Sequence, residues 1–192
     1  MARILITGSA DGLGRYTAET LLQEGHRVVV HARSAERVAS VQDLLDRGAE
    51  GIVGDLADID QIRHIAGQVN RLGRMYAVIH NAGVLHGPDI FQVNVAAPYL
   101  LTALIHRPRR LIYVSSGMHR GGRARIENRT QVTYSDSKLY LTALAAAVAR
   151  LWPDIPSNAV DPGWVPTRMG GAGAPDDLRL GHRTQEMAGR QR

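Results

Sequence analysis

The chain of 192 residues contains no cysteine. This absence excludes disulfide bonds and thiolate metal sites, and it leaves the redox compartment undetermined. The chain also lacks any apolar run close to the ~18 residues that a membrane-spanning helix needs. Residues 1–7 already have the composition of a strand, which leaves no place for a signal peptide. We therefore expect a cytoplasmic protein with no membrane partner.

Aromatic residues are scarce as well, at 5% of the chain. This scarcity bears on the net charge of +5, because proteins that bind nucleic acid commonly combine basic residues with aromatic stacking platforms. Here the basic residues gather only in two small clusters, 107–110 and 120–129. The eight histidines are dispersed, without the spacing of metal ligands. We expect neither a nucleic-acid partner nor a metal site.

Lysine occurs once, at Lys138, whereas the other side chains of this charge are all arginine. Tyr134 stands four residues earlier, so on a helix the two side chains lie one turn apart on the same face. A nearby ammonium lowers the pKa of a phenol from about 10 and makes it a usable proton donor and acceptor. Arginine cannot supply so compact and pKa-responsive a charge. The pair indicates an acid/base site, and the alternative is a chance pair on a solvated helix.

Short apolar runs alternate with helical stretches along the chain. The expected strands are 3–7, 26–31, 51–54, 76–80, 110–114 and 158–160. The runs are continuous in Val, Ile and Leu, as burial on both faces of a parallel sheet requires. This pattern predicts an α/β fold: one doubly wound Rossmann-type domain of about six strands, shortened at the C-terminus. We expect the catalytic domain to cover 1–168, followed by a partly disordered tail of loop and one short helix over 169–192.

Three glycines follow the first strand and enter a helix. Gly8, Gly12 and Gly14 lack side chains, so the backbone can approach a pyrophosphate beside the positive end of that helix. The strand–loop–helix context is the one that a dinucleotide site requires, and a flexible turn is the alternative. Within this loop the predicted cofactor site also includes Ser9, Asp11 and Leu13.

The end of the second strand bears on the cofactor's ribose. An acidic residue there would hold a 2′-hydroxyl, whereas an arginine accommodates a 2′-phosphate. The stretch His31-Ala32-Arg33-Ser34 has no acid and one arginine. Arg33 therefore favours NADP, and NAD stays open because a solvated arginine at a loop is the competing interpretation.

Polar residues also end the next three strands. Asp55-Leu56, Asn81-Ala82-Gly83 and Ser115-Ser116 all fall where the carboxyl ends of parallel strands form the ligand-binding edge. Helix caps and turns are the ordinary roles of such residues. A serine here could hydrogen-bond and polarise a substrate carbonyl. There is no Gly-x-Ser-x-Gly elbow, so the serines do not indicate a hydrolase.

Together with Asn94 and the stretch Asp161-Pro162-Gly163-Trp164-Val165-Pro166-Thr167, these motifs stand in the order of a known family. The sequence resembles the short-chain dehydrogenases/reductases. The resemblance implies that Tyr134 is the general acid/base and that Lys138 lowers its pKa and holds the nicotinamide ribose. It also implies that Ser116 orients the carbonyl, with Ser115 as the second choice, and that Asn94 holds a water in a proton relay to Lys138.

The resemblance likewise implies the cofactor contacts. Asp55 would contact the adenine, Asn81 and Gly83 the middle of the cofactor, and the segment 162–167 its nicotinamide end. The other residues in this predicted site are Leu56, Ala82, Pro162, Gly163, Val165 and Thr167. The expected reaction interconverts an alcohol and an aldehyde or ketone by hydride transfer to or from the nicotinamide.

The sequence departs from the family pattern in three places. The spacing from Asn81 to Asn94 is shorter than usual, and the loop from Ser116 to Tyr134 is longer and carries four arginines: Arg120, Arg123, Arg125 and Arg129. After Thr167 no further strand is readable, so substrate closure would be weak or would come from residues 164–185. A shortened non-catalytic NAD(P)-binding or regulatory protein is therefore the alternative function.

Two predicted helices, 89–105 and 133–151, are apolar nearly all round. One face of each would pack on the sheet, and the other indicates a homodimer or a higher homo-oligomer. Burial of that face under a loop is the competing interpretation.

Overall fold

The computed structural model describes residues 1–125 and 127–189, with the side chains of 184–189 excepted. Position 126 of the basic cluster and the last three residues of the predicted tail lie outside the described residues. In the described part no helix is both long and apolar enough to cross a bilayer.

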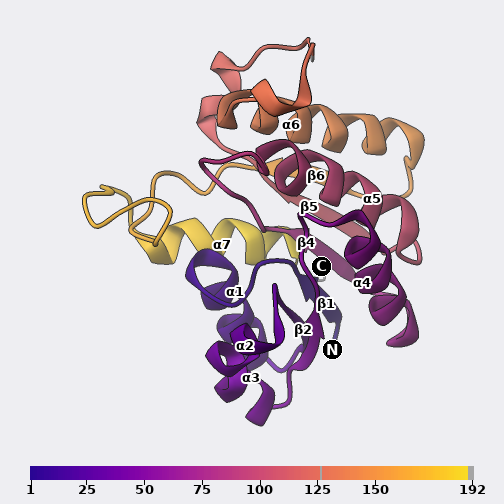
Figure 1. Cartoon of the computed structure of the whole chain (residues 1–192). Coiled ribbons are helices and arrows are strands. Elements are labelled where there is room, and N and C mark those ends of the chain that lie inside the picture. Colours follow the sequence, from indigo (N-terminus) through magenta and orange to yellow (C-terminus); the bar gives the residue numbers. More distant parts are fainter. Residues whose placement is uncertain (126, 190–192) are drawn as a thin grey trace.

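Six parallel strands form one sheet, as the sequence predicts (Figure 1). The strands are β1 (Arg3–Ile6), β2 (Arg27–Ala32), β3 (Glu50–Val53), β4 (Ala77–His80), β5 (Arg110–Val114) and β6 (Ser157–Val160). Their order is β3-β2-β1-β4-β5-β6, so the direction of winding reverses between β1 and β4. Ile4 on β1 pairs with Val28 on one side and with Ala77 on the other. Ligands bind at such a reversal, beyond the carboxyl ends of the strands.

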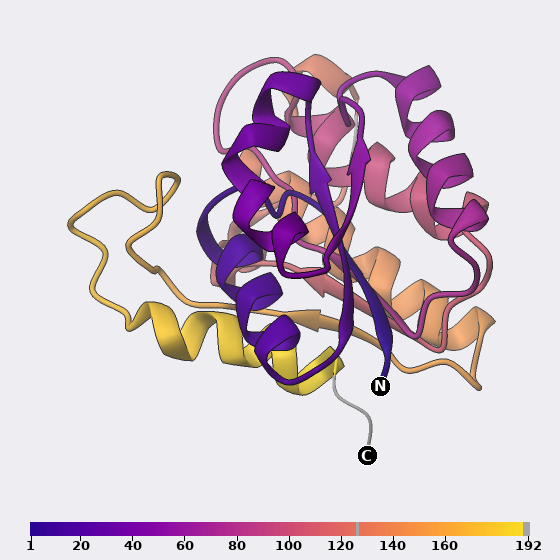
Figure 2. The same ribbon diagram turned by 90° about the horizontal axis from the view of Figure 1, so that it is seen from below.

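Helices connect the strands and cover both faces of the sheet. The helices are α1 (Gly12–Gln23), α2 (Ala35–Val38), α3 (Gln42–Asp46), α4 (Ile59–Arg71), α5 (Ala97–Leu104), α6 (Tyr134–Leu151) and α7 (Leu178–Gly189). Short 3-10 turns occur at Ala39–Val41, Gly117–Gly121 and Arg129–Gln131, and a π-helical stretch at Gln92–Ala96 leads into α5. Figures 1 and 2 show α4, α5 and α6 on one face of the sheet and α1 and α7 on the other.

Each face has its own apolar core, and β1 contributes to both. Leu5 points into the core beneath α4, α5 and α6, whereas its neighbours Ile4 and Ile6 point into the core beneath α1. Successive side chains of a strand point to opposite faces. A central strand covered on both sides therefore needs an apolar residue at every position, which explains the continuous runs in the sequence.

The helix α7 packs beside α1 and against β4, β5 and β6. Its Gly181 lies so close to the rest of the chain that an added Cβ would stand 2.8 Å from Val165, 2.9 Å from the Pro162 carbonyl and 3.3 Å from Leu13. This close approach brings α7 into contact with the segment after β6 and with the start of α1. The sheet has no seventh strand within the described residues.

Candidate active site

A cavity of about 1060 Å³ runs along the carboxyl edge of the sheet. Residues from the loop after every strand line it, and they include nearly all of the predicted site. Three predicted residues, Ser9, Gly14 and Asn94, do not line the cavity. The size is that of a site for a large cofactor with a small substrate.

The glycine loop needs its glycines for two different reasons. Gly8 and Gly12 adopt left-handed backbone angles, with φ of +63° and +55°, a region that favours glycine. A Cβ on Gly8 would also stand 2.8 Å from the Ala82 Cα. Gly14 instead packs against the Asn81 side chain, where a Cβ would overlap the amide. Gly14 therefore shapes the loop from behind the cavity.

Two side chains fix the backbone of this loop. The Asn81 amide donates to the Thr7 and Gly8 carbonyls, both at 3.0 Å. The Ser9 hydroxyl donates to the Ile6 carbonyl at 2.9 Å and accepts from the His31 backbone N–H at 2.8 Å. Ser9 therefore joins β1 to β2, and its predicted place in the cofactor site is a supporting one.

His31 holds the start of the glycine loop, a role that the sequence analysis missed. Its Nδ1 accepts the Gly8 backbone N–H at 3.0 Å, and its Nε2 is 2.8 Å from the Gly54 carbonyl. Because Nδ1 accepts, the ring is neutral with its proton on Nε2. Burial lowers the pKa of His31, which keeps that neutral form. The only signal in the sequence is a polar residue inside the apolar run of β2.

Two arginines line the end of the cavity beside β2. Arg33 follows the strand, is exposed and lines the cavity, while its contact with a 2′-phosphate stays a prediction. Arg37 on α2 was not predicted, and its guanidinium lies 2.9 Å from the Asp11 carboxylate. Asp11 is the N-cap of α1 but makes no side-chain hydrogen bond to that helix. Asp11 thus lines the cavity with its carboxylate paired to Arg37.

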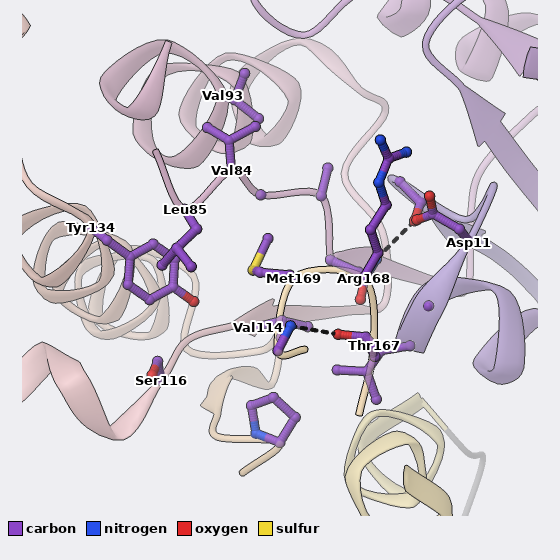
Figure 3. A pocket seen from close by; sticks show the side chains of 18 of the residues that line it. Asp11, Val84, Leu85, Val93, Val114, Ser116, Tyr134, Thr167, Arg168 and Met169 are labelled. Atoms are coloured by element: carbon purple, nitrogen blue, oxygen red, sulfur yellow. Dashed lines mark hydrogen bonds between the residues drawn. The ribbon is translucent and has the colours of Figure 1, made fainter. Parts of the chain in front are cut away.

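At the opposite end of the cavity lies Tyr134 (Figure 3). Tyr134 and Lys138 are on the first turns of α6. Lys138 is 3% exposed, and its ammonium donates to the Val114 carbonyl at 2.6 Å. The same Nζ is 5.3 Å from the centroid of the Tyr134 ring. Burial lowers the pKa of Lys138 to about 8, and the charge of Asp161 opposes this shift.

The pKa of Tyr134 corrects a prediction. We expected Lys138 to lower it, but burial of the half-buried ring raises it, while a hydrogen bond with the Ser116 side chain acts in the opposite direction. The physical reason is geometric: the ammonium lies by the ring and donates to Val114. Tyr134 is therefore a neutral phenol at neutral pH.

The two candidate serines have different surroundings. Ser116 borders the cavity, and its side chain lowers the pKa of Tyr134. Ser115 is buried, and its hydroxyl is 2.7 Å from the Thr142 hydroxyl and 3.3 Å from the Lys138 carbonyl. Ser116 thus faces the cavity, whereas the Ser115 hydroxyl contacts α6.

Asn94 stands behind the cavity on the π-helical stretch, a distortion often found at functional sites. Its side chain accepts the Val84 N–H at 2.8 Å, and donates to the Val84 carbonyl at 2.9 Å and to the Ser137 hydroxyl at 3.0 Å. A Cβ on Gly83 would stand 3.4 Å from the Asn94 Oδ1 and 3.7 Å from the Lys138 Nζ. Asn94 is thus near Lys138, while its predicted water relay stays a prediction.

Apolar side chains form much of the wall near Tyr134 and were not predicted. They come from several segments of the chain: Val84, Leu85, Val93, Met118, Trp164 and Met169. Figure 3 shows Tyr134 and Ser116 at one end, Asp11 at the other, and Met169 between them. No group of three or more metal-ligating side chains occurs in the part of the chain that the structure describes.

Comparisons with known proteins agree with this arrangement. The family model for short chain dehydrogenases matches residues 2–177. An uncharacterized oxidoreductase of Emericella nidulans is 42% identical over 193 residues, which cover 93% of this chain and 76% of the relative.

Solved structures share the fold. The RhlG/NADP active-site complex of Pseudomonas aeruginosa gives a TM-score of 0.78 at 22% identity, covering 98% of this chain and 90% of that one. A blue fluorescent protein from a metagenomic library, in complex with NADPH, gives a TM-score of 0.75 at 27% identity, covering 93% and 81%. The family match and the close relative together establish that this chain belongs to the short-chain dehydrogenase family of oxidoreductases.

Proposed function

We propose that this protein interconverts an alcohol and a carbonyl compound with NADP as the preferred hydride carrier and Tyr134 as the general acid/base. One observation carries the proposal. Tyr134 and Ser116 border the same cavity as the glycine loop, and the buried Lys138 ammonium lies 5.3 Å from the centroid of the Tyr134 ring. A proton donor and a dinucleotide cradle therefore share one site.

The residues of the glycine loop fit a dinucleotide. Side chains are absent where the backbone turns left-handed at Gly8 and Gly12. The N-cap Asp11 leaves the first N–H groups of α1 without a side-chain acceptor, so they are available to a pyrophosphate. The bound cofactor would supply or accept the hydride. Arg33 and Arg37 would hold a 2′-phosphate, and the NADP and NADPH in the two structural neighbours support that choice.

The catalytic side chains would then transfer the proton. In carbonyl reduction, Tyr134 donates its phenolic proton to the carbonyl oxygen, and Ser116 donates a hydrogen bond to that oxygen. The Ser116 side chain, which lowers the pKa of Tyr134, would help to stabilise the phenolate left on Tyr134. The neutral phenol found at rest suits reduction, and the same steps in reverse serve oxidation.

The walls near Tyr134 indicate the kind of substrate. Their exposed atoms come from aliphatic, thioether and indole side chains, such as Leu85, Met118 and Trp164. We propose an aldehyde or ketone with an apolar body, bound mainly by burial of its hydrocarbon surface.

We also propose a homodimer. Apolar side chains remain exposed on both helices for which an interface was predicted: Tyr99 (58%) and Leu104 (41%) on α5 and Leu151 (74%) on α6. Light scattering coupled to size exclusion gives the mass directly, and a monomer at micromolar concentration would refute this part.

Turnover and binding, measured side by side, test the function. The purified protein is titrated with NADPH and NADH while Trp164 fluorescence is followed, since this indole borders the cavity. The same sample is then assayed for oxidation of the reduced cofactor by a panel of aldehydes and ketones. Binding with turnover supports the proposal. Tight binding without turnover on any carbonyl would point to the non-catalytic alternative.

A further inference from the structure

The residues 117–132, the loop between β5 and α6, are attached to the first turn of α6 at one carboxylate. The Asp136 side chain is 4% exposed. Its Oδ1 accepts the Arg123 backbone N–H at 2.7 Å and the Arg123 Nε at 3.3 Å. Its Oδ2 accepts the Arg123 Nη2 at 2.8 Å and the Thr133 backbone N–H at 3.0 Å. One buried carboxylate thus receives four hydrogen bonds, three of them from Arg123.

The backbone next to Arg123 lies directly on α6. A Cβ on Gly122 would stand 2.5 Å from the Ser135 carbonyl oxygen and 2.9 Å from the Leu139 Cβ. The Tyr140 hydroxyl donates to the Arg123 carbonyl at 2.8 Å. Only glycine allows this approach, so residues 122 and 123 are held to the helix by packing and by polar contacts on both sides.

This attachment joins the two segments that carry the catalytic pair. Ser116 follows β5, and the turn Gly117–Gly121 leads from it toward Arg123. Arg123 binds Asp136, which stands two residues after Tyr134 on α6. The Arg123–Asp136 contact is therefore a junction between the loop that begins beside Ser116 and the helix that begins at Tyr134.

We propose that Asp136, with Arg123 as its partner, is a positioning residue that sets the place of Ser116 relative to Tyr134. The proposal rests on the proposed function. Neither Asp136 nor Arg123 lines the main cavity, so they would act through the two catalytic side chains.

A role in capping alone does not account for these contacts. Capping of α6 uses the Thr133 side chain and the Thr133 N–H, the reciprocal pair of a capping box. The three bonds from Arg123 come in addition and reach into the loop that bears Ser116. Arg123 also holds the pKa of Asp136 far below its usual range. The carboxylate therefore stays charged over the whole pH range of an enzyme assay.

Three variants remove the attachment in steps. Arg123→Gln removes the side-chain bonds, Asp136→Asn removes the charge and keeps one acceptor oxygen, and Asp136→Ala removes the acceptor. We expect kcat to fall in that order, by roughly tenfold or more for Asp136→Asn, because small misplacements of catalytic groups are costly. The dissociation constant of NADPH should not change. Arg125→Gln is the matched control, since Arg125 pairs with Glu127 in the same loop and both are exposed, at 87% and 74%.

A double-mutant cycle separates positioning from a general loss of structure. If Asp136 acts through the position of Ser116 relative to Tyr134, Asp136→Asn should reduce kcat strongly in the wild-type background and little further in a Ser116→Ala background. Equal fold-losses in both backgrounds, or a loss shared by Arg125→Gln, would overturn the proposal.

A second readout does not depend on turnover. The ionisation of Tyr134 is followed by NMR of tyrosine labelled at Cζ, assigned with Tyr134→Phe. Because the Ser116 hydrogen bond lowers the pKa of Tyr134, Asp136→Asn should raise it toward the value in Ser116→Ala. If no carbonyl is turned over but this shift appears, the proposed function fails while the positioning role stands. An unchanged Tyr134 titration would overturn the positioning role itself.

Discussion

The Lys138 ammonium lies 5.3 Å from the centroid of the Tyr134 ring while it donates a 2.6 Å hydrogen bond to the Val114 carbonyl. The hydrogen bond thus holds the lysine to β5, and the lysine also borders the cavity. A buried cation with one neutral hydrogen-bond partner is costly to maintain. Its retention as the only lysine of the chain is consistent with a catalytic use.

The cost of burying Lys138 should appear as a pH dependence of stability. Burial lowers the pKa of Lys138 from 10.5 to about 8. Between these values the unfolded chain binds the proton and the folded chain does not. The free energy of unfolding therefore rises as the pH is raised from about 8 to 10.5, and this gain is lost again as the pH falls to about 8. In Lys138→Met this dependence disappears.

We therefore expect the free energy of unfolding of Lys138→Met, relative to wild type, to increase by about 3 kcal/mol as the pH is lowered from 10.5 to 8. Urea unfolding at several pH values measures it, and no other lysine titrates in the chain. A difference between the two proteins that is flat with pH would contradict the buried ammonium.

Substitutions of the two serines should have different effects on kcat and on stability. Ser116→Ala removes a hydrogen-bond donor from the cavity and should lower kcat by roughly a hundredfold, the loss seen for one oxyanion donor. Ser115→Ala leaves the Thr142 hydroxyl with one partner fewer and should cost about 1 kcal/mol of stability, with kcat near that of wild type. Steady-state kinetics and thermal unfolding of both variants check this, and the reverse assignment would show the opposite pattern.

The arginines beside β2 should select the cofactor. Arg33→Gln and Arg37→Gln should each weaken NADPH binding by roughly tenfold, since a charge-assisted bond to phosphate is lost, and leave NADH binding unchanged. Asp11→Asn releases Arg37 from its 2.9 Å ion pair and should strengthen NADPH binding. Fluorescence titrations measure the affinity for both cofactors. Equal weakening of NADH binding would show that these residues do not distinguish the cofactors by their 2′-substituent.

His31 should make cofactor binding sensitive to acid. Protonation of Nδ1 would remove the acceptor of the Gly8 N–H. Because burial lowers the pKa of His31 from 6.5, the unfolded chain binds this proton at a higher pH than the folded chain does. The stability that the neutral ring contributes is therefore present above pH 6.5 and is lost as the pH falls toward the pKa of His31 in the folded chain.

We expect His31→Leu to weaken NADPH binding at every pH and to lose about 1–3 kcal/mol of stability, because the Gly8 N–H and the Gly54 carbonyl lose their partner. His64→Asn, at an exposed position of α4, is the control for histidine titration. A variant at His31 with wild-type affinity would show that the ring does not organise the loop.

The fold could be predicted because its strands and its first loop are specified by short stretches of sequence. Continuous apolar runs such as Val28–Val30 specify strands buried on both faces, and Gly8 and Gly12 mark the loop that their left-handed angles require. The cavity brings most of the predicted residues together because carboxyl ends of parallel strands share one edge.

The missed features depend on contacts between distant segments. Arg37 reaches Asp11, and Arg123 reaches Asp136, only after the loops have packed. The raised pKa of Tyr134 depends on burial of its ring, which spacing alone does not report. The π-helical stretch at Asn94 has no periodicity that distinguishes it from the α-helix that follows.

The most direct test of the central claim is Tyr134→Phe, because this change removes one hydroxyl and keeps the ring. NADPH binding is measured by fluorescence, and turnover by oxidation of NADPH with the best carbonyl of the panel. We expect wild-type binding and a fall in kcat of roughly a hundred- to ten-thousandfold, the contribution of a general acid. Turnover at the wild-type rate in Tyr134→Phe would contradict this claim.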